Sequence, residues 1–210
     1  MYNKDYAEKW IKYEESGQDL LRKEHIFPYL EEVLNSSGRI LDVGCGWGAT
    51  LDFIYPECEY TGIDPTNEFF DFIKEKYSRQ MNLVKGSLPS DLNVKDNYFD
   101  IVLCSMVLHC VDDLEKSVET LFNKVKKNGK VVIIDFNDSS EPLLRDLFIN
   151  LDEDEEKYVK GLYNLSSDIQ LYGEIHLYKE DEIEFELLKY SGFKKRILGP
   201  FVGYEINFTC

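Results

Sequence analysis

The stretch that most constrains this fold is residues 40–48, "ILDVGCGWG", in which an apolar run passes into glycines at every second position. Residues 39–43 predict a short buried strand. Glycine is used where a turn needs an unusual backbone conformation or where another group approaches the backbone closely. The pattern therefore predicts a tight turn after a buried strand, with a ligand held close to the backbone of that turn.

The rest of the chain alternates between strand-like and helix-like patterns. The predicted strands are 39–43, 60–63, 82–85, 101–105, 130–136, 194–198 and 204–209, and the predicted helices are 4–16, 18–35, 50–55, 68–77, 114–125 and 182–191. The last two strands are predicted to form an antiparallel hairpin, and the "KKNG" segment to end the helix before the fifth strand. This order predicts a doubly wound α/β sheet.

Charge and cysteine usage exclude several classes of partner. Lys and Arg number 24 and Asp and Glu 40, which gives a formal net charge of −16. Such a surface repels phosphate backbones, so nucleic acid is disfavoured as the main partner. An apolar run long enough to span a membrane and a secretory leader pattern are both lacking, so we expect a cytoplasmic protein without membrane contact. Five cysteines without a CxxC pair predict reduced thiols.

Polar and small residues stand at the ends of four consecutive predicted strands. Ligands of open α/β sheets bind beyond the carboxyl ends of the strands. Residues 44–48 follow the first strand, Asp64 ends the second, 87–89 follow the third and 105–109 follow the fourth. A carboxylate at Asp64 can accept both hydroxyls of a ribose, so the ligand is predicted to be nucleoside-like. Gly44-x-Gly46-x-x-Ala49 also fits the dinucleotide-binding pattern, so an NAD(P)-dependent oxidoreductase is an alternative.

Five segments in order resemble the successive motifs of the S-adenosylmethionine-dependent methyltransferases with a Rossmann-like fold, the class I superfamily. They are "ILDVGCGWG", "YTGID", "LVKGSLPSD", "FDIVLCSMVLHCVDD" and "KKNGKVVIIDF", and they span about residues 39–136. The resemblance implies a mostly parallel seven-stranded sheet whose last strand is antiparallel, and methyl transfer from S-adenosylmethionine. It also implies that N-terminal helices and a helical insertion after the fifth strand cover the active site. A protein that binds this cofactor without turnover is a further alternative.

The resemblance also assigns roles to individual residues. It places the methionine end of the cofactor at the glycine turn, the ribose at Asp64, the adenine at 86–88 and the cofactor's amino group at the carbonyls of 105–106. The residues implied are Asp42, Gly44, Cys45, Gly46, Asp64, Pro65, Gly86, Ser87, Leu88, Ser105 and Met106. S-adenosylmethionine is cationic at sulfur and nitrogen and has no phosphate, which suits an acidic site without a nearby lysine. Ser87 stands where the family often has Asp, and a hydroxyl bonds an adenine nitrogen more weakly than a carboxylate does.

The acceptor is predicted to be a small molecule methylated on oxygen or nitrogen. The Asn- or Asp-Pro-Pro-aromatic motif of enzymes that methylate base amino groups is absent from "SMVLHC". The predicted substrate residues are Tyr6, Trp10, Tyr13, His25, Tyr163, Tyr172 and Tyr178. A base is needed only for an acceptor that carries a proton, and His109 and His176 are the candidates. For each of these side chains, ordinary packing or a hydrogen bond at a helix start is the alternative role.

No metal-ligand spacing is present in the sequence, and either a monomer or a homodimer is compatible with it. We expect a single domain over residues 1–210. Its predicted parts are an N-terminal helical cap at 1–37, a cofactor-binding core at 38–137, a substrate-covering insertion at 138–181 and a C-terminal helix with strands at 182–210.

Overall fold

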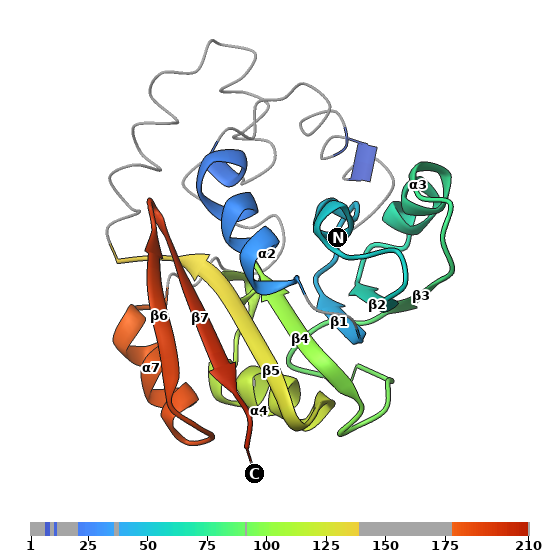
Figure 1. The fold of residues 1–210 in the computed structure, drawn as a ribbon. Coiled ribbons are helices and arrows are strands. Elements are labelled where there is room, and N and C mark those ends of the chain that lie inside the picture. The colour runs from blue at the N-terminus through green and yellow to red at the C-terminus, as the bar shows by residue number, and fades with distance from the viewer. Residues whose placement is uncertain are drawn as a thin grey trace.

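The computed structural model describes residues 7–8, 11, 21–35, 38–90, 92–138 and 178–209. These residues build a seven-stranded sheet in the order β3-β2-β1-β4-β5-β7-β6 (Figure 1). The strands are β1 Arg39–Val43, β2 Glu59–Asp64, β3 Met81–Lys85, β4 Phe99–Ser105, β5 Val125–Phe136, β6 Phe193–Leu198 and β7 Phe201–Asn207. Strands β1 to β5 run parallel, and β7 is antiparallel to both β5 and β6. The predicted mostly parallel sheet with an antiparallel last strand is confirmed.

Helices cover both faces of this sheet, as a doubly wound α/β fold requires. The α-helices are α2 Phe27–Val33, α3 Glu68–Lys76, α4 Leu114–Lys124 and α7 Glu180–Leu188. Three shorter turns are the π-helical η1 Arg22–Ile26 and the 3₁₀-helical η2 Ala49–Phe53 and η3 Leu108–Cys110. Figure 1 shows α2 in front of the central strands, with α4 and α7 on the opposite side.

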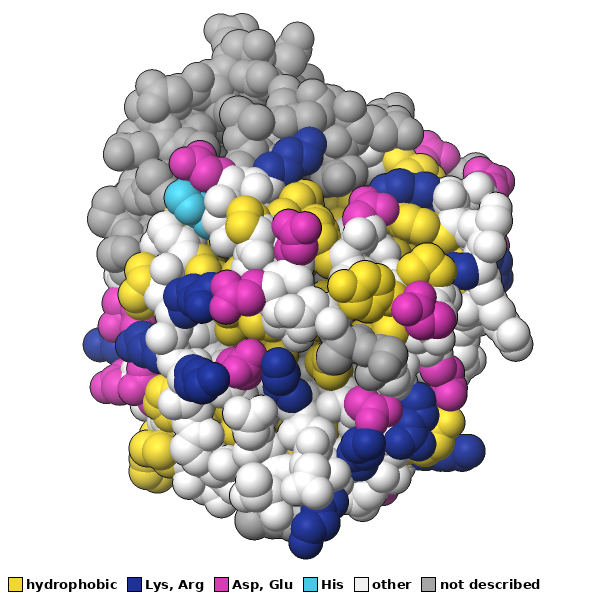
Figure 2. Space-filling model, viewed as in Figure 1, with side chains coloured by type: hydrophobic (Ala, Val, Ile, Leu, Met, Phe, Trp, Pro, Cys, Tyr) yellow, Lys and Arg dark blue, Asp and Glu magenta, His cyan; other side chains and the backbone are white. Residues whose placement is uncertain are grey.

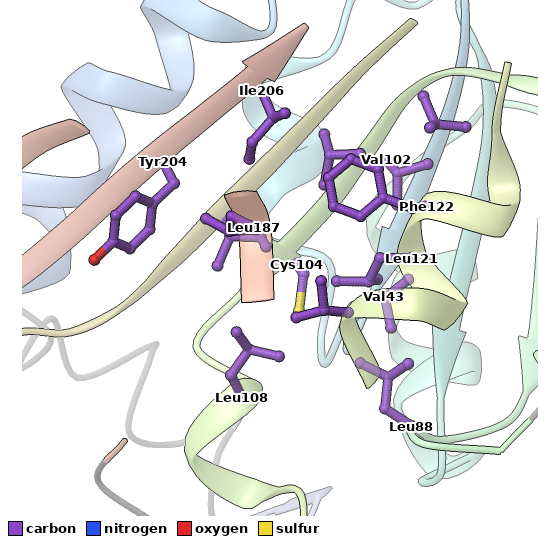
Figure 3. Close-up of a cluster of buried hydrophobic side chains, with 14 of the residues drawn as sticks. Val43, Leu88, Val102, Cys104, Leu108, Leu121, Phe122, Leu187, Tyr204 and Ile206 are labelled. Atoms are coloured by element: carbon purple, nitrogen blue, oxygen red, sulfur yellow. The ribbon is translucent and has the colours of Figure 1, made fainter. Parts of the chain in front are cut away.

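Two hydrophobic clusters follow from the alternation of side chains along the strands. In β5, Val131 and Ile133 pack in the cluster that includes α4 and α7, whereas Val132 and Ile134 pack in the cluster that includes α2. Figure 3 shows part of the first cluster, with side chains of β4, β7, α4 and α7 directed at one another. Each fully buried aliphatic side chain of this kind stabilises the fold by about 1.5–3 kcal/mol relative to exposure. The packed sheet therefore holds the loops at its strand ends in fixed positions.

The helix before β5 differs from its prediction. The helix α4 starts at an N-cap residue, Asp113, whose carboxylate accepts a hydrogen bond of 2.9 Å from the Lys116 amide. It ends at Lys124, and the segment predicted as its last turn belongs to β5. The reason is strand pairing, because the Asn128 amide donates to the Phe208 carbonyl at 2.8 Å and the Phe208 amide to the Gly129 carbonyl at 2.9 Å. These bonds hold the segment in the sheet.

The predicted helix 50–55 is also different, since it is the short 3₁₀ turn η2. Gly48 precedes η2 with a left-handed φ of 82°. Of the predicted helix 18–35, residues 18–20 lie outside the described residues, and the rest forms η1 and α2. Apart from the start of β5, the other observed boundaries lie within three residues of the predicted ones, including the antiparallel hairpin of β6 and β7. Residues 139–177, most of the predicted insertion, lie outside the described residues, and so does most of the predicted helix 4–16. The division of the chain into four parts therefore stays a prediction.

The described surface mixes both signs of charge. Figure 2 shows basic and acidic side chains interspersed over one face. Among the described residues, no helix has the length and apolar character needed to cross a membrane, and no cluster of side chains suitable for a metal ion is present. The four described cysteines, Cys45, Cys58, Cys104 and Cys110, are free thiols, as predicted.

Candidate functional site

The loops that follow the parallel strands are tied to one another by backbone hydrogen bonds. The Ile63 carbonyl of β2 accepts from the Gly44 amide at 2.7 Å and from the Cys45 amide at 2.9 Å, both in the loop after β1. The Gly86 amide after β3 donates to the Asp64 carbonyl at 3.2 Å, and the Met106 amide after β4 donates to the carbonyl of Ile134 in β5 at 2.8 Å. These bonds join the ends of β1, β2 and β3, and separately those of β4 and β5, and the pairing of β1 with β4 brings the two sets to one edge of the sheet. The sequence predicted this edge for the first four strands.

The glycine turn has the backbone that its sequence predicts, with Gly44, Gly46 and Gly48 all at positive φ. A Cβ added to Gly44 would lie 2.2 Å from the Cγ2 atom of Val107, so this glycine permits contact between the loops after β1 and β4. Among the described residues, a Cβ added to Gly46 would meet no atom within 4 Å. The described part of the chain thus leaves space beside the Gly46 backbone at the strand edge, where a ligand can approach.

Asp64 anchors this turn with its carboxylate. Its Oδ2 atom accepts from the Gly46 amide at 2.9 Å, and its Oδ1 atom accepts from the Thr66 amide at 2.8 Å. Only 7% of the residue is exposed. Burial raises the pKa of Asp64 to about 6, although the bonds from Thr66 and Gly46 oppose that rise. Each carboxylate oxygen keeps a second lone pair, so both can still accept from a hydroxyl.

Asp42 is almost fully buried, with 1% of the residue exposed. Its Oδ2 atom accepts from the hydroxyl of Thr50 and, at 2.9 Å, from the hydroxyl of Tyr60. Burial raises the pKa of Asp42, and the two hydroxyl donors oppose the rise. In the described residues its partners are these two hydroxyls, which connect β1, η2 and β2 beneath the glycine turn. The predicted contact with the methionine end stays a prediction.

The end of β4 has a strained backbone at Met106 and a buried hydroxyl, that of Ser105, without a partner in the described residues. Met106 has a φ of 60°, which costs a non-glycine residue about 1–2 kcal/mol. The hydroxyl of Ser105 is buried and has no hydrogen-bond partner within the described residues. A buried hydroxyl without a partner is costly unless a ligand satisfies it. The Ser105 hydroxyl can therefore donate a hydrogen bond to a ligand. The predicted contact of the carbonyls of 105–106 with the cofactor's amino group stays a prediction.

His109 lies in η3, directly beyond β4, and is 9% exposed. Its Nδ1 atom lies 2.8 Å from Oδ1 of Asp135, a residue near the end of β5 that is itself 2% exposed. The amide of His109 also donates to Oδ2 of Asp135 at 3.2 Å. Burial alone lowers the pKa of His109, but Asp135 and the adjacent Cys110 raise it well above its ordinary value. The site thus contains a buried, carboxylate-paired histidine.

The other predicted cofactor residues lie at the same edge with varied exposure. Ser87 is exposed, and Gly86 and Pro65 are half-buried. The side chain of Leu88 points into the hydrophobic cluster of Figure 3, so only its backbone remains for a ligand. Cys45 is buried within the glycine turn, and burial raises the pKa of its thiol well above the ordinary value.

Two of the predicted substrate residues, His25 and Tyr178, lie within the described residues. The His25 ring packs on the β6–β7 turn, because a Cβ added to Gly199 would lie 2.7 Å from its ring atoms. The hydroxyl of Tyr178 donates to the Val111 carbonyl at 2.8 Å, which joins the start of α7 to the segment after η3. Six predicted residues lie outside the described residues, namely Tyr6, Trp10, Tyr13, Tyr163, Tyr172 and His176.

Sequence reasoning missed the partners of two site residues. The sequence predicts Asp135 only as part of a buried strand. An acidic residue near the carboxyl end of an apolar run also indicates a possible site residue. The hydroxyls of Thr50 and Tyr60 gave no such signal, because their contact with Asp42 joins three elements.

Three observations of the structure indicate that these residues can accommodate S-adenosylmethionine. The space beside Gly46 admits a ligand to the backbone. Asp64 has free acceptor capacity toward ribose hydroxyls. The buried Ser105 hydroxyl lacks a partner within the described chain. The groups that hold the cofactor in the resemblance are therefore brought to one edge of the sheet.

Comparisons with known proteins find methyltransferases. Residues 41–133 match the family model described as a methyltransferase domain. The human thiol S-methyltransferase TMT1A is 30% identical over 115 residues, which are 51% of this chain and 47% of that protein. The uncharacterized methyltransferase YcgJ of Bacillus subtilis is 31% identical over 117 residues, 53% of this chain and 46% of that protein. The chain spans less than half the length of these curated relatives.

Solved structures show the same fold. A crystal structure of an S-adenosylmethionine-dependent methyltransferase from Aquifex aeolicus aligns with a TM-score of 0.60 at 16% identity, over 90% of this chain and 92% of that one.

Proposed function

We propose that the protein transfers a methyl group from S-adenosylmethionine to an oxygen or nitrogen of a small-molecule acceptor, in keeping with the match of residues 41–133 to a methyltransferase domain. The observation that carries the proposal is the space that the described residues leave beside Gly46, bordered by the Asp64 carboxylate that accepts from the Gly46 amide. A cytoplasmic location, a small-molecule partner and a monomeric or homodimeric state are parts of the same proposal.

The chain's own residues bind and orient the reactants. S-adenosylmethionine supplies an activated methyl group when bound. Gly46 admits the cofactor to the backbone, Asp64 accepts hydrogen bonds from the ribose hydroxyls, and the hydroxyl of Ser105 donates to a polar atom of the ligand. Displacement at the methyl carbon requires alignment of the attacking atom with the leaving sulfur and the exclusion of water, which a rigid sheet edge favours.

His109 is the group that would receive a proton from the acceptor. It lies directly beyond β4, and its loop is tied to the β1 loop through the contact of Val107 with Gly44. His176 lies outside the described residues and stays a second candidate. The human relative named a thiol S-methyltransferase extends the acceptors to be tested from phenols, alcohols and amines to thiols.

Calorimetric titration with S-adenosylmethionine, S-adenosylhomocysteine, NADH and NADPH tests the proposal. We expect micromolar binding of the two sulfur nucleosides and none of the nicotinamides. The variant Gly46→Ala fills the space at φ 50° and should weaken S-adenosylhomocysteine binding at least about tenfold. Gly192→Ala is the matched control, because a Cβ there also meets nothing within 4 Å and the residue lies away from the site.

Two results would overturn the proposal. Binding of the nicotinamides alone would return the protein to the oxidoreductase alternative. Equal affinity for S-adenosylhomocysteine in Gly46→Ala and Gly192→Ala would show that the glycine turn is not part of the binding site. Once binding is established, formation of S-adenosylhomocysteine with a panel of phenols, amines and thiols distinguishes an enzyme from a protein that only binds the cofactor.

A further inference from the structure

We propose that Asp135 is the positioning residue for His109, and that this pair selects an acceptor whose nucleophilic atom carries a proton to be removed, namely a phenol, an ammonium group or a thiol. The proposal rests on the proposed methyl transfer, restricts its oxygen and nitrogen acceptors to those with such a proton, and adds thiols.

Asp135 accepts three hydrogen bonds that fix its carboxylate. Its Oδ1 atom accepts from the Phe136 amide at 2.8 Å and lies 2.8 Å from His109 Nδ1, and its Oδ2 atom accepts from the His109 amide at 3.2 Å. A carboxylate oxygen can only accept, so the 2.8 Å contact between Nδ1 and Oδ1 requires that Nδ1 carry a proton and donate it to Asp135. The nitrogen left to accept a proton is therefore Nε2.

The ring of His109 is also held by its surroundings. The centroids of its ring and the Phe136 ring are 5.0 Å apart, with the planes inclined by 61°. The side chains of His109 and Asp135 are 11% and 3% exposed. A buried imidazole that bonds a carboxylate through one nitrogen and packs edge-on against an aromatic ring has one orientation. Such preorganisation is what a proton acceptor at a reacting centre needs.

The charge of Asp135 strengthens the base. Burial lowers the pKa of His109, but Asp135 from β5 and the Cys110 thiol beside it in η3 together raise that pKa well above its ordinary value. Asp135 stabilises the imidazolium that forms when Nε2 takes a proton. The effect is the one that a carboxylate has on a histidine in other base-catalysed reactions.

The acceptor class follows from the proton that the pair can remove. The bond between the acceptor atom and its hydrogen breaks, the proton passes to Nε2, and the electron pair left on the acceptor atom forms the bond to the methyl carbon. The electron pair of the broken carbon–sulfur bond stays on sulfur, and the imidazolium later releases its proton to water. A carboxylate or a tertiary amine has no such proton to give, so the pair offers it no assistance. Phenols, thiols and alkylammonium groups have protons of comparable acidity, so a strengthened imidazole can take the proton of any of them.

The first test is an NMR titration of the histidine rings, which needs no acceptor. In the wild-type chain we expect His109 to be protonated at Nδ1 and to titrate above its ordinary pKa of about 6.5. In Asp135→Asn the pKa of His109 should fall by at least about one unit, a tenfold loss of proton affinity. Asp100→Asn is the matched control, since it removes a carboxylate from the opposite end of the neighbouring strand β4. Asp135→Glu should restore most of the wild-type value.

Two NMR results would refute the positioning role. One is a wild-type His109 that titrates at or below about pH 6.5. The other is an unchanged His109 pKa in folded Asp135→Asn. If Asp135→Asn does not fold, the wild-type titration and the protonation state of Nδ1 decide the matter alone.

The second test measures formation of S-adenosylhomocysteine with phenol, benzyl mercaptan, benzoate and N,N-dimethylaniline, at a pH above the titration of His109. The first two acceptors are largely protonated there and need a base, so turnover should occur with them, and His109→Gln and Asp135→Asn should lower it at least about tenfold at unchanged affinity for S-adenosylhomocysteine. Turnover confined to benzoate or dimethylaniline, or no turnover of phenol and benzyl mercaptan, would overturn the acceptor class. Absence of S-adenosylhomocysteine binding would instead refute the proposed function itself.

Discussion

Acidification is expected to stabilise the ligand-free protein through Asp64 while it weakens cofactor binding. Burial raises the pKa of Asp64 from an ordinary 3.8 to about 6 in the folded chain. Between those two values the folded state holds a proton that the unfolded state has lost, so lowering the pH through about 6 favours folding. From about pH 7.5 to about pH 5.5, this one group should add about 0.8 kcal/mol to the free energy of unfolding.

The ligand responds in the opposite direction. The ribose hydroxyls need the ionised carboxylate as an acceptor, and protonation of Asp64 takes one acceptor oxygen away. If the bound complex requires the ionised form, the affinity for S-adenosylhomocysteine should fall about fourfold between about pH 7.5 and about pH 5.5. Few single groups give stability and affinity opposite pH dependences, so the pair of measurements identifies Asp64.

The assay is urea unfolding and calorimetric titration with S-adenosylhomocysteine at the two pH values, on the wild type and on Asp64→Asn. The amide cannot ionise, so the variant should lack the contribution of this residue to both pH dependences. Asp100→Asn is the control, because burial raises the pKa of Asp100 but Lys126 and Arg39 lower it to about 2, outside the tested range. The reasoning is refuted if wild type and Asp64→Asn show the same pH dependence of both quantities.

Three further substitutions test the packing around the site by urea unfolding. Gly44→Ala should lower the free energy of unfolding by about 2–4 kcal/mol, because its Cβ would lie 2.2 Å from Val107 Cγ2 at a φ of 76°; an unchanged midpoint would contradict the contact between these loops. Tyr60→Phe removes a hydroxyl 2.9 Å from buried Asp42 and should cost about 1–3 kcal/mol, and a neutral effect would mean that Asp42 finds another donor. Leu103→Ala, at a fully buried position of β4, should cost about 2–5 kcal/mol, whereas a loss below about 1 kcal/mol would show that the core collapses around the gap.

The sequence by itself determined the sheet and the position of the binding edge. Buried strands alternate with helices, and parallel strands present their carboxyl ends on one side, so Asp64 and the glycine turn had to lie together. The positive φ values of Gly44, Gly46 and Gly48 follow from the same local pattern. These features depend on spacing along the chain, which the sequence contains directly.

Other features depended on which strands and helices became neighbours. Residues 125–129 left the predicted helix because β5 pairs there with β4 and with the segment after β7, a long-range contact that local propensity does not encode. The side chain of Leu88 turned into the hydrophobic cluster, and the Tyr178 hydroxyl bonded Val111.

The pairing of His109 with Asp135 was also decided by tertiary structure alone. The two residues are 26 positions apart, and the sequence predicted His109 as a candidate base without indicating its partner. They meet because β4 and β5 are adjacent and parallel, so the ends of the two strands lie side by side. The spacing of the motifs along the chain predicted which edge of the sheet holds the candidate site. Only the register of β4 against β5 placed the Asp135 carboxylate 2.8 Å from the His109 ring.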